Sequence, residues 1–574
     1  MKKKFSPIKT IIAGLLFVIA ANIIASFFFT RFDLTSEKRY TLSEATVDLL
    51  DELDDYVYVK IMLTGKDLPM GFQRLKNETK EMLDEFAAHN KYVEYVFVDP
   101  TKVGNSDDVM AAYKELAEKG LQPTDLRVNK KTGTERKVIF PGALITYKDR
   151  EIPVQLLQSQ MGIPSEEVLN NSIQNLEYNF SNAIRKLVGT SKSSVAIIEG
   201  YGGFRKDYFM SFEYLLSEYY SVSYVNIDGQ LNSLANIRSR GEDSVLMENK
   251  YSAIIIPGPT QAVPEKDKFI IDQYIMRGGK VLWLVEPVYV TMDSLQNAPT
   301  TLAVNNYTNL QDQLYNYGVR LEPQLVMDLQ CISIPLTTGS VGGRPQIEFF
   351  PWPFFPVLTP ATTHPIVKNL NAIKTEFISP ITKIDIPNVK HSVLLHSSQY
   401  SKIFATPDVV SLELLTLKPD PALFNKRNVP VALLLEGTFR SLYDNRIPPD
   451  IRDNAMISFL HESKPTAMVV VSDADMIKNQ FRAGDGMPFN MGYDQYTDNQ
   501  FGNPEFFLNV MNYLCDDTKL ISVRSRELKL RILDVAKIES NPLKYQLINL
   551  IIPSLIIIIC GLIYSIIRKY KYSK

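Results

Sequence analysis

Two long apolar segments, one near each end of the 574-residue chain, constrain this protein more than any other feature of its sequence. Residues 11–30 are apolar apart from a few small polar side chains, and residues 545–567 form a second apolar run. A helix of about 20 apolar residues is long enough to cross a bilayer. We therefore expect a transmembrane helix at each end. A cleaved signal peptide is the alternative for the first segment, but no A-x-A cleavage pattern follows it.

Basic residues flank both apolar segments on their outer sides. Residues 1–10 contain Lys2, Lys3, Lys4 and Lys9, and residues 568–574 contain Arg568, Lys569, Lys571 and Lys574. The positive-inside rule places such basic flanks in the cytoplasm. Both termini are thus predicted to be cytoplasmic tails of a protein of the bacterial inner membrane. The bulk of the chain, from residue 31 to about 544, is expected in the periplasm.

The first part of the soluble region, residues 31–160, alternates helical and strand patterns in the order β-α-β-α-β-β. This order resembles a thioredoxin-like α/β domain. Thr41 and Glu44 have the spacing of a capping box, which predicts that a helix begins with Thr41 as its N-cap. The region contains no cysteine, and this excludes thiol redox chemistry there.

A helical pattern over residues 161–190 is expected to link this domain to a second, larger α/β region, 191–520. The strands of the second region read as short continuous apolar runs, at 195–198, 253–256, 281–285 and 468–471. Such runs predict a parallel sheet that helices cover on both faces. Between about 325 and 430 the pattern changes to that of a mixed β insertion. Residues 521–544 are expected to lead into the membrane.

Four acidic residues, Glu199, Glu286, Asp473 and Asp475, follow directly after predicted parallel strands. Ligand crevices in such sheets lie at the carboxyl ends of the strands. Paired carboxylates there could perform acid/base chemistry or hold a cation, so these residues form a possible ligand crevice. The alternative, which is the more common role of acidic residues at such places, is that they cap helices and solvate loops.

A run of aromatic residues interleaved with prolines, 349–356, is the most unusual stretch of the sequence. Phe350, Trp352, Phe354 and Phe355 could form an exposed loop that docks a partner, because aromatic side chains dominate interface hot spots. The alternative, which we favour, is that these rings cover the protein's own core.

Several classes of function find no support in the sequence. The chain lacks a G-x-x-x-x-G-K-[ST] phosphate loop and a G-x-S-x-G nucleophile elbow. Its five histidines show no H-E-x-x-H spacing, so no metal site, catalytic residue or cofactor is predicted. A formal net charge of −2 gives no indication of a nucleic-acid partner.

A series of short motifs, in the same order along the chain, resembles the GldG family, the auxiliary (substrate-binding) proteins of a gliding-motility ABC transporter. The motifs are Asp33-Leu34-Thr35 with Lys38-Arg39-Tyr40-Thr41-Leu42-Ser43, Val98-Asp99-Pro100, Ile256-Pro257-Gly258-Pro259, Asp272-Gln273-Tyr274-Ile275-Met276 with Gly278-Gly279-Lys280, and Glu436-Gly437. The resemblance extends over essentially the whole chain. It implies a Bacteroidetes transport system with a GldF-like permease and a GldA-like ATPase as partners.

The resemblance also implies a fold for the larger domain, namely a flavodoxin-like sheet similar to that of class I glutamine amidotransferases. Those enzymes carry a cysteine nucleophile after a strand. Here Pro257-Gly258-Pro259 follows the corresponding strand, without a cysteine, and this departure argues against amidotransferase activity.

Together, the sequence and the resemblance predict a non-enzymatic, membrane-anchored periplasmic subunit of an ABC transporter that assists or engages the substrate in gliding motility. The alternatives are a membrane-anchored periplasmic hydrolase-like enzyme and a structural scaffold of the motility machinery.

Overall fold

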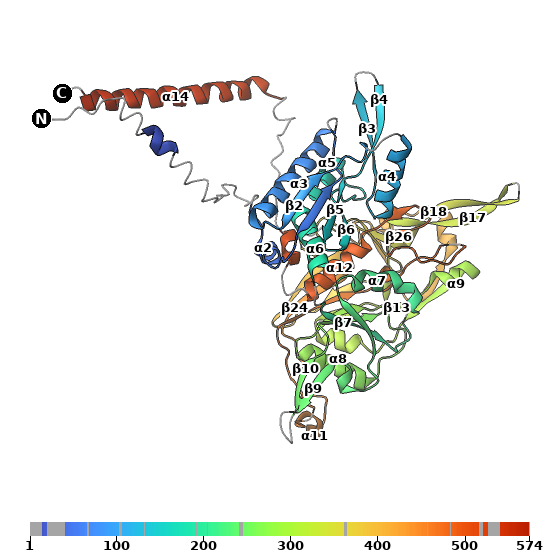
Figure 1. The fold of residues 1–574 in the computed structure, drawn as a ribbon. Helices are drawn as coiled ribbons and strands as arrows, with labels where there is room; N and C mark the ends of the chain where they lie inside the picture. Colours follow the sequence, from blue (N-terminus) through green and yellow to red (C-terminus); the bar gives the residue numbers. More distant parts are fainter. Residues whose placement is uncertain are drawn as a thin grey trace. The chain divides into compact units, whose positions relative to one another are not determined.

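The computed structural model describes residues 14–19, 41–65, 68–102, 106–130, 133–189, 192–203, 205–239, 245–341, 343–360, 364–455, 457–482, 484–515, 520–525 and 540–572. The chain divides into two compact units, 1–526 and 527–574. The first unit combines several sheets with helices (Figure 1), so the predicted mixed α/β class is confirmed.

The N-terminal part of the first unit contains a four-stranded sheet in the order β2-β1-β5-β6. Strands β1 and β2 are parallel, and the other neighbours are antiparallel. A separate antiparallel hairpin is formed by β3 and β4. The elements are α2 (Glu44–Asp51), β1 (Val57–Ile61), α3 (Met70–His89), β2 (Val93–Phe97), α4 (Ser106–Glu118), β3 (Thr124–Lys130), β4 (Gly133–Ile139), β5 (Gly142–Tyr147), β6 (Arg150–Gln155), α5 (Ser165–Gln174) and α6 (Leu176–Val188).

One apolar core joins this sheet to helices α3, α5 and α6. The buried face of α3 consists of Leu75, Thr79, Leu83 and Phe86. Their spacing of three and four residues keeps these side chains on one side of the helix. Helix α6 contributes Phe180 and Ile184 to the same core. The residues that were expected to link two domains pack against the first of them, and α6 also contacts α12 (Asn503–Cys515) of the second, where Tyr178 donates a hydrogen bond to Asn509 and Arg185 donates one to Asn512.

Helix α2 begins after Ser43, and the predicted cap at Thr41 is wrong by two residues. The Ser43 hydroxyl accepts a hydrogen bond from the Thr46 N–H at 3.2 Å. The Ser43 N–H in turn donates to Glu177 Oε1 on α6 at 2.7 Å. Serine caps a helix as well as threonine does, so the tertiary bond to Glu177 helps to decide which residue is used.

The second part of the first unit is organised around a seven-stranded sheet in the order β21-β24-β25-β12-β11-β7-β8. The five strands from β25 to β8 are parallel, whereas β24 and β21 are antiparallel to their neighbours. The strands are β7 (Ser194–Glu199), β8 (Ser221–Asn226), β11 (Ala253–Pro257), β12 (Lys280–Leu284), β21 (Val389–His396), β24 (Pro430–Gly437) and β25 (Thr466–Val471).

Helices cover both faces of this sheet. On β11, Ala253 and Ile255 belong to one apolar cluster, and Ile254 and Ile256 belong to another. Successive side chains of a strand point to opposite faces, so the continuous apolar run is buried on both sides. Helices α7 (Met210–Ser217) and α12 (Asn503–Cys515) pack into the first cluster, and α8 (Glu265–Met276) and α10 (Gln311–Asn316) pack into the second.

Small sheets make up most of the mixed β region, and they share a further apolar core. Its longest element is a hairpin of β17 (Cys331–Val341) and β18 (Arg344–Leu358), visible at the right of Figure 1. The other strands of this part of the chain are β9 (Ala235–Ser239), β10 (Val245–Asn249), β13 (Val288–Tyr289), β14 (Thr300–Asn305), β15 (Val319–Leu321), β16 (Gln324–Asp328), β19 (Ile373–Lys374), β20 (Ile381–Lys383), β22 (Ser401–Ala405), β23 (Asp408–Ser411), β26 (Tyr493–Asp494) and β27 (Asn499–Gln500). Short helices are α9 (Met292–Asn297), α11 (Pro449–Arg452), η1 (Lys206–Phe209), η2 (Leu231–Ser233), η3 (Leu412–Thr416), η4 (Pro421–Leu423), η5 (Asp475–Ile477) and η6 (Leu520–Ser525).

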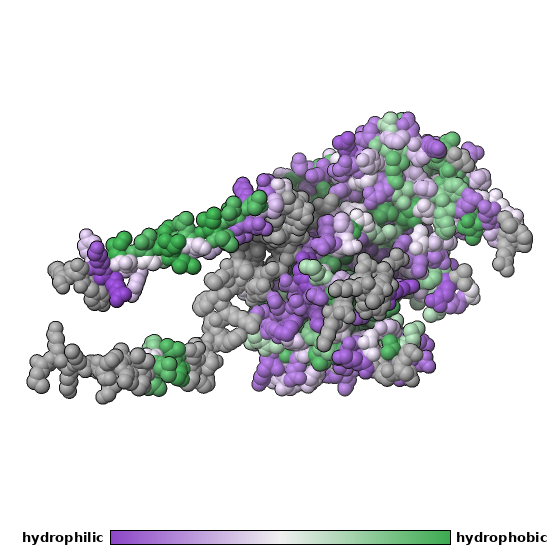
Figure 2. Space-filling model, turned by 90° about the horizontal axis from the view of Figure 1, so that it is seen from above, coloured by the Kyte–Doolittle hydropathy of each residue, from purple (hydrophilic) through white to green (hydrophobic). Residues whose placement is uncertain are grey.

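The second unit contains one long helix, α14 (Pro542–Tyr572). Residues Pro542–Tyr570 are long and apolar enough to cross a membrane, with a mean hydropathy of 2.8 in the most apolar window. Apolar side chains cover most of its length in Figure 2. The predicted second membrane segment, 545–567, lies within this helix. Of the predicted first segment, only residues 14–19 are described, and they are helical; the rest lies outside the described residues.

Candidate functional site

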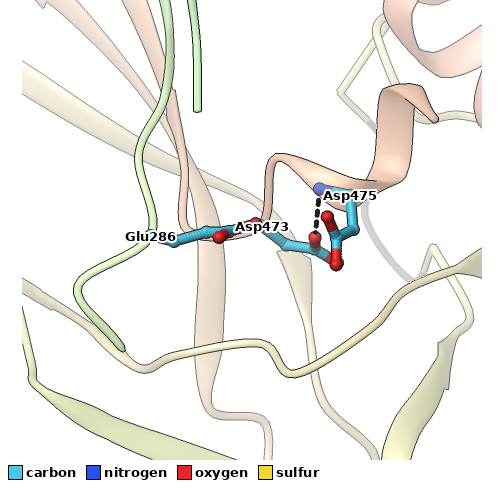
Figure 3. A group of neighbouring side chains, drawn as sticks. All are labelled: Glu286, Asp473 and Asp475. Carbon is cyan, nitrogen blue, oxygen red and sulfur yellow. Dashed lines mark hydrogen bonds between the residues drawn. The ribbon is translucent and has the colours of Figure 1, made fainter. Parts of the chain in front are cut away.

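The site of interest lies at the carboxyl ends of two neighbouring parallel strands, β12 and β25. Glu286 follows β12 by two residues, and Asp473 follows β25 by two residues. Asp475 begins the short helix η5. Because the strands are adjacent and parallel, the three side chains converge (Figure 3), with one oxygen of each within 4.8 Å of the others. We call these three residues the acidic group.

Backbone N–H groups hold the acidic group in place. Asp473 accepts hydrogen bonds from the Glu376 N–H at 2.9 Å and from the Asp475 N–H at 2.8 Å. Glu286 Oε1 accepts from the Ala474 N–H at 3.1 Å. These bonds tie the turn after β25 to the turn after β12 and to the segment that follows β19. The carboxylates of Glu286 and Asp473 therefore have a structural role, whatever else they do.

Burial and crowding of like charges shift the protonation of this group. Burial, assisted by the charge of Asp475, raises the pKa of Glu286 to about 8. Burial raises the pKa of Asp473 well above its usual range, and the nearby Asp475 and Glu286 add to the effect. At neutral pH, which is below the pKa of Glu286, this residue is thus mostly protonated.

A lysine supplies counter-charge. The Lys478 ammonium forms an ion pair with Asp475. Burial opposes the charged form of Lys478, but the charges of Asp475 and Glu286 outweigh it and raise the pKa of Lys478. Three carboxylates offer the oxygen ligands that a hard cation prefers. Here a cation would have to compete with the ammonium of Lys478 for Asp475. A protonated carboxyl beside an ionised one is also the arrangement used in acid/base chemistry.

The fourth predicted crevice residue, Glu199, is not part of the acidic group. It ends β7, which β11 separates from β12, and it pairs with Lys206 at 3.2 Å. Together with residues 200–203 and Pro257, it lines a smaller hollow of about 170 Å³. The structure thus brings together three of the four predicted carboxylates.

A larger open cleft, of about 760 Å³, lies beside the acidic group. Asp475 and Lys478 line it, together with Lys374, Glu376 and Asp494. The Lys374 ammonium lies 3.6 Å from a carboxylate oxygen of Glu376 and 3.6 Å from one of Asp494. Burial raises the pKa of Glu376. The sequence did not identify Lys374, Glu376 or Asp494 as site residues. Each of them lies in or beside an irregular segment that has neither a strand-end pattern nor a motif.

The aromatic run, residues 349–356, lies within strand β18 and does not form a loop. Trp352 and Phe354 are 0% exposed and Phe355 is 6% exposed, and all three belong to the core of the mixed β region. Phe350 is partly buried. Phe355 also lines the cleft.

Comparison with known proteins gives a family for the larger part of the chain. Residues 192–510 match the model of a family described as "ABC-type uncharacterized transport system", and residues 36–146 match a domain family of unknown function. A protein of Borreliella burgdorferi (strain B31), described as "Uncharacterized protein", is 22% identical over 583 residues, which cover 100% of both chains.

Among solved structures, the mmIFT52 N-terminal domain aligns with 56% of this chain and 98% of its own length. The sequence identity is 11% and the TM-score is 0.31. A TM-score this low does not establish a shared fold.

Proposed function

We propose that this chain, which belongs to the ABC-type uncharacterized transport system family, is a non-enzymatic accessory subunit that engages the substrate or a partner of an ABC transporter. The family match over residues 192–510, more than half of the chain, carries this proposal. The energy must come from a separate ATPase, because the sequence contains no phosphate loop.

Helix α14 supports the proposal that the subunit is anchored in a membrane. Its 31 residues span about 46 Å at 1.5 Å per residue, more than the ~30 Å of a hydrocarbon core. The basic residues in its last two turns, beginning with Arg568, favour a cytoplasmic C-terminus. With a second anchor at residues 11–30, the soluble region would lie in the periplasm, held to the inner membrane at both ends.

The strand orders support finer fold assignments. Numbered by their order in the chain, the five parallel strands of the large sheet run 2-1-3-4-5, which is the flavodoxin-like order. In the small sheet, a parallel β-α-β unit is followed by an antiparallel hairpin next to β1, as proposed for a thioredoxin-like domain. We propose these two folds for the two parts of the first unit.

The ordered motifs that resemble the GldG family support the proposal that the transporter partners are a GldF-like permease and a GldA-like ATPase, and that the process is gliding motility. Affinity purification of the tagged full chain from its host in mild detergent should recover both partners. A matched control replaces α14 with an unrelated apolar helix of the same length. Recovery lost only in the control would place the contact on α14, whereas a reproducibly partner-free preparation of the native chain would contradict the proposal.

The acidic group gives a specific reason to keep an enzyme as the second candidate, because shifted carboxyl pKa values beside a cleft often mark catalytic sites. Glu286→Gln and Asp473→Asn, made separately, test this reading. If both variants accumulate normally and support full cellular function, acid/base catalysis by this group is refuted. A scaffold without any ligand, the remaining alternative, predicts in addition that no solute stabilises the purified chain against heat.

A further inference from the structure

The outer edge of β17 is open. The sheet order β17-β18-β19 leaves β17 with β18 as its one strand partner among the described residues. Along such an edge, alternate backbone N–H and C=O groups point away from the sheet without a strand to pair with. Ile332 and Ile334 hold the strand in place, since both side chains are buried in the core of the mixed β region.

The cleft described above runs along this edge. Six consecutive residues of β17, 332–337, line it. Successive side chains of a strand point to opposite faces, so a hollow over one face would touch every second residue. A hollow that touches six in a row lies against the edge of the strand. Six residues of a partner strand would extend about 20 Å along it.

The remaining lining of the cleft, which we call its acidic and aromatic wall, comes from other segments of the chain. Its charged residues are Asp293, Lys374, Glu376, Asp475, Lys478 and Asp494, an excess of two acidic side chains over basic ones. Tyr208, Phe481, Tyr493 and Tyr496 supply aromatic rings. Negative charge and ring faces both attract ammonium and guanidinium groups.

We propose that this cleft binds an extended segment of a partner polypeptide, which adds to the edge of β17 as an antiparallel or parallel strand and directs a lysine or arginine side chain to the acidic and aromatic wall. In this mode of recognition the main chain provides affinity and side-chain pockets provide specificity. Pro335 lacks an N–H, so at this position the strand can offer a partner only its C=O. A small solute would use the wall but leave the main-chain groups of the edge unpaired.

This inference rests on the proposed accessory role in one respect. It states which kind of ligand, an extended basic polypeptide segment, the soluble region of such a subunit engages. The two can fail separately. Peptide binding is measured on the purified chain, whereas the accessory role is tested by recovery of a permease and an ATPase from cells.

The test uses the purified full chain in detergent and pools of blocked eight-residue peptides with randomised flanks. One pool has a fixed central arginine, and the other has a fixed central glutamate. We expect the arginine pool to be retained and to yield peptides whose affinity falls at least about tenfold when alternate backbone nitrogens are methylated, since methylation removes the pairing donors. Hydrogen exchange should slow in 331–341 when these peptides bind.

Two variants locate the binding. Glu376→Gln removes a charge from the cleft wall, and Glu348→Gln removes an exposed charge from β18 outside the cleft. We expect Glu376→Gln to weaken the selected peptides several-fold and Glu348→Gln to leave them unchanged. Equal retention of both pools, equal effects of the two variants, or undiminished binding of the methylated peptides would each overturn the proposal. So would the absence of binding, or concentration-dependent pairing of two chains through β17 in place of peptide.

Discussion

Replacing Glu286 by glutamine tests the electrostatic description of the acidic group directly. A carboxyl group whose pKa is higher in the folded chain than in the unfolded chain binds its proton more tightly when folded. The folded state therefore loses stability as the pH rises from 4.5, the unperturbed pKa, to about 8, the pKa in the fold. Glutamine resembles the protonated carboxyl and can still accept the Ala474 N–H, but it cannot ionise. Glu286→Gln should remove this part of the pH dependence.

The size of the effect follows from the shift. At about 1.4 kcal/mol per pH unit, a rise from 4.5 to about 8 corresponds to about 5 kcal/mol in a fully desolvated site. Glu286 is partly exposed, and water screens its charge, so we expect about 2 kcal/mol. With an unfolding entropy of about 2.1 cal/mol/K per residue over roughly 300 residues, this amounts to a melting-temperature difference of ~3 °C.

The assay is thermal unfolding of the purified full chain from about pH 5 to about pH 8. Wild type should lose ~3 °C more than Glu286→Gln over this interval. Glu199→Gln is the matched control, because Glu199 ends β7 at the same edge of the sheet but pairs with Lys206 outside the acidic group. Because Glu286 also raises the pKa of Asp473 and of Lys478, the difference between wild type and Glu286→Gln reports the titration of the coupled group to which Glu286 belongs. Parallel profiles for wild type and Glu286→Gln would refute the reasoning.

Three further changes have expected outcomes. Ile255→Ala empties a fully buried position of β11 and should lower the free energy of unfolding by about 2–5 kcal/mol, measured from denaturant midpoints. Gly437→Ala should destabilise by at least about 2 kcal/mol in the same assay, because Gly437 has φ +148° and an added Cβ would overlap the Asn388 carbonyl oxygen. Asp272→Asn replaces a buried acceptor of the Tyr317 and Ser441 hydroxyls and the Leu442 N–H, and should cost about 1–3 kcal/mol, visible as a lower melting temperature.

The buried strands were identifiable from the sequence because burial on both faces requires a continuous apolar run. The runs at 253–256, 281–285 and 468–471 form β11, β12 and β25. Local patterns carry no information about which strands become neighbours, however. The pairing of β12 with β25 depends on packing throughout the second part of the first unit. The convergence of Glu286 with Asp473 follows from that pairing.

Other parts of the site gave no local signal. Glu376 follows the two-residue strand β19, and Asp494 lies in the two-residue strand β26 within a loop rich in glycine, asparagine and aspartate. Strands this short have no detectable periodicity.

The aromatic run is part of a strand although its proline content is typical of a loop. Proline is tolerated in a strand where one side lacks a partner. Strand β19 pairs only with Val357 and Leu358 of β18, so Pro351 faces Ser333 of β17 on one side and has no strand partner on the other among the described residues. Pro353 lies where the register between β17 and β18 shifts. A segment that reads as a stiff proline-rich loop can therefore extend as a strand.

The position of β25 in the sheet has a consequence for the order of folding. Strand β12 ends at Leu284 and its parallel neighbour β25 begins at Thr466. Their pairing closes a loop of about 180 residues, an entropic cost that must be met before the contact contributes. Until that closure, Glu286 and Asp473 are separate, hydrated carboxylates with ordinary proton affinity. The pKa values of both carboxyl groups therefore rise late in folding. Proton uptake near neutral pH would report when the sheet is completed.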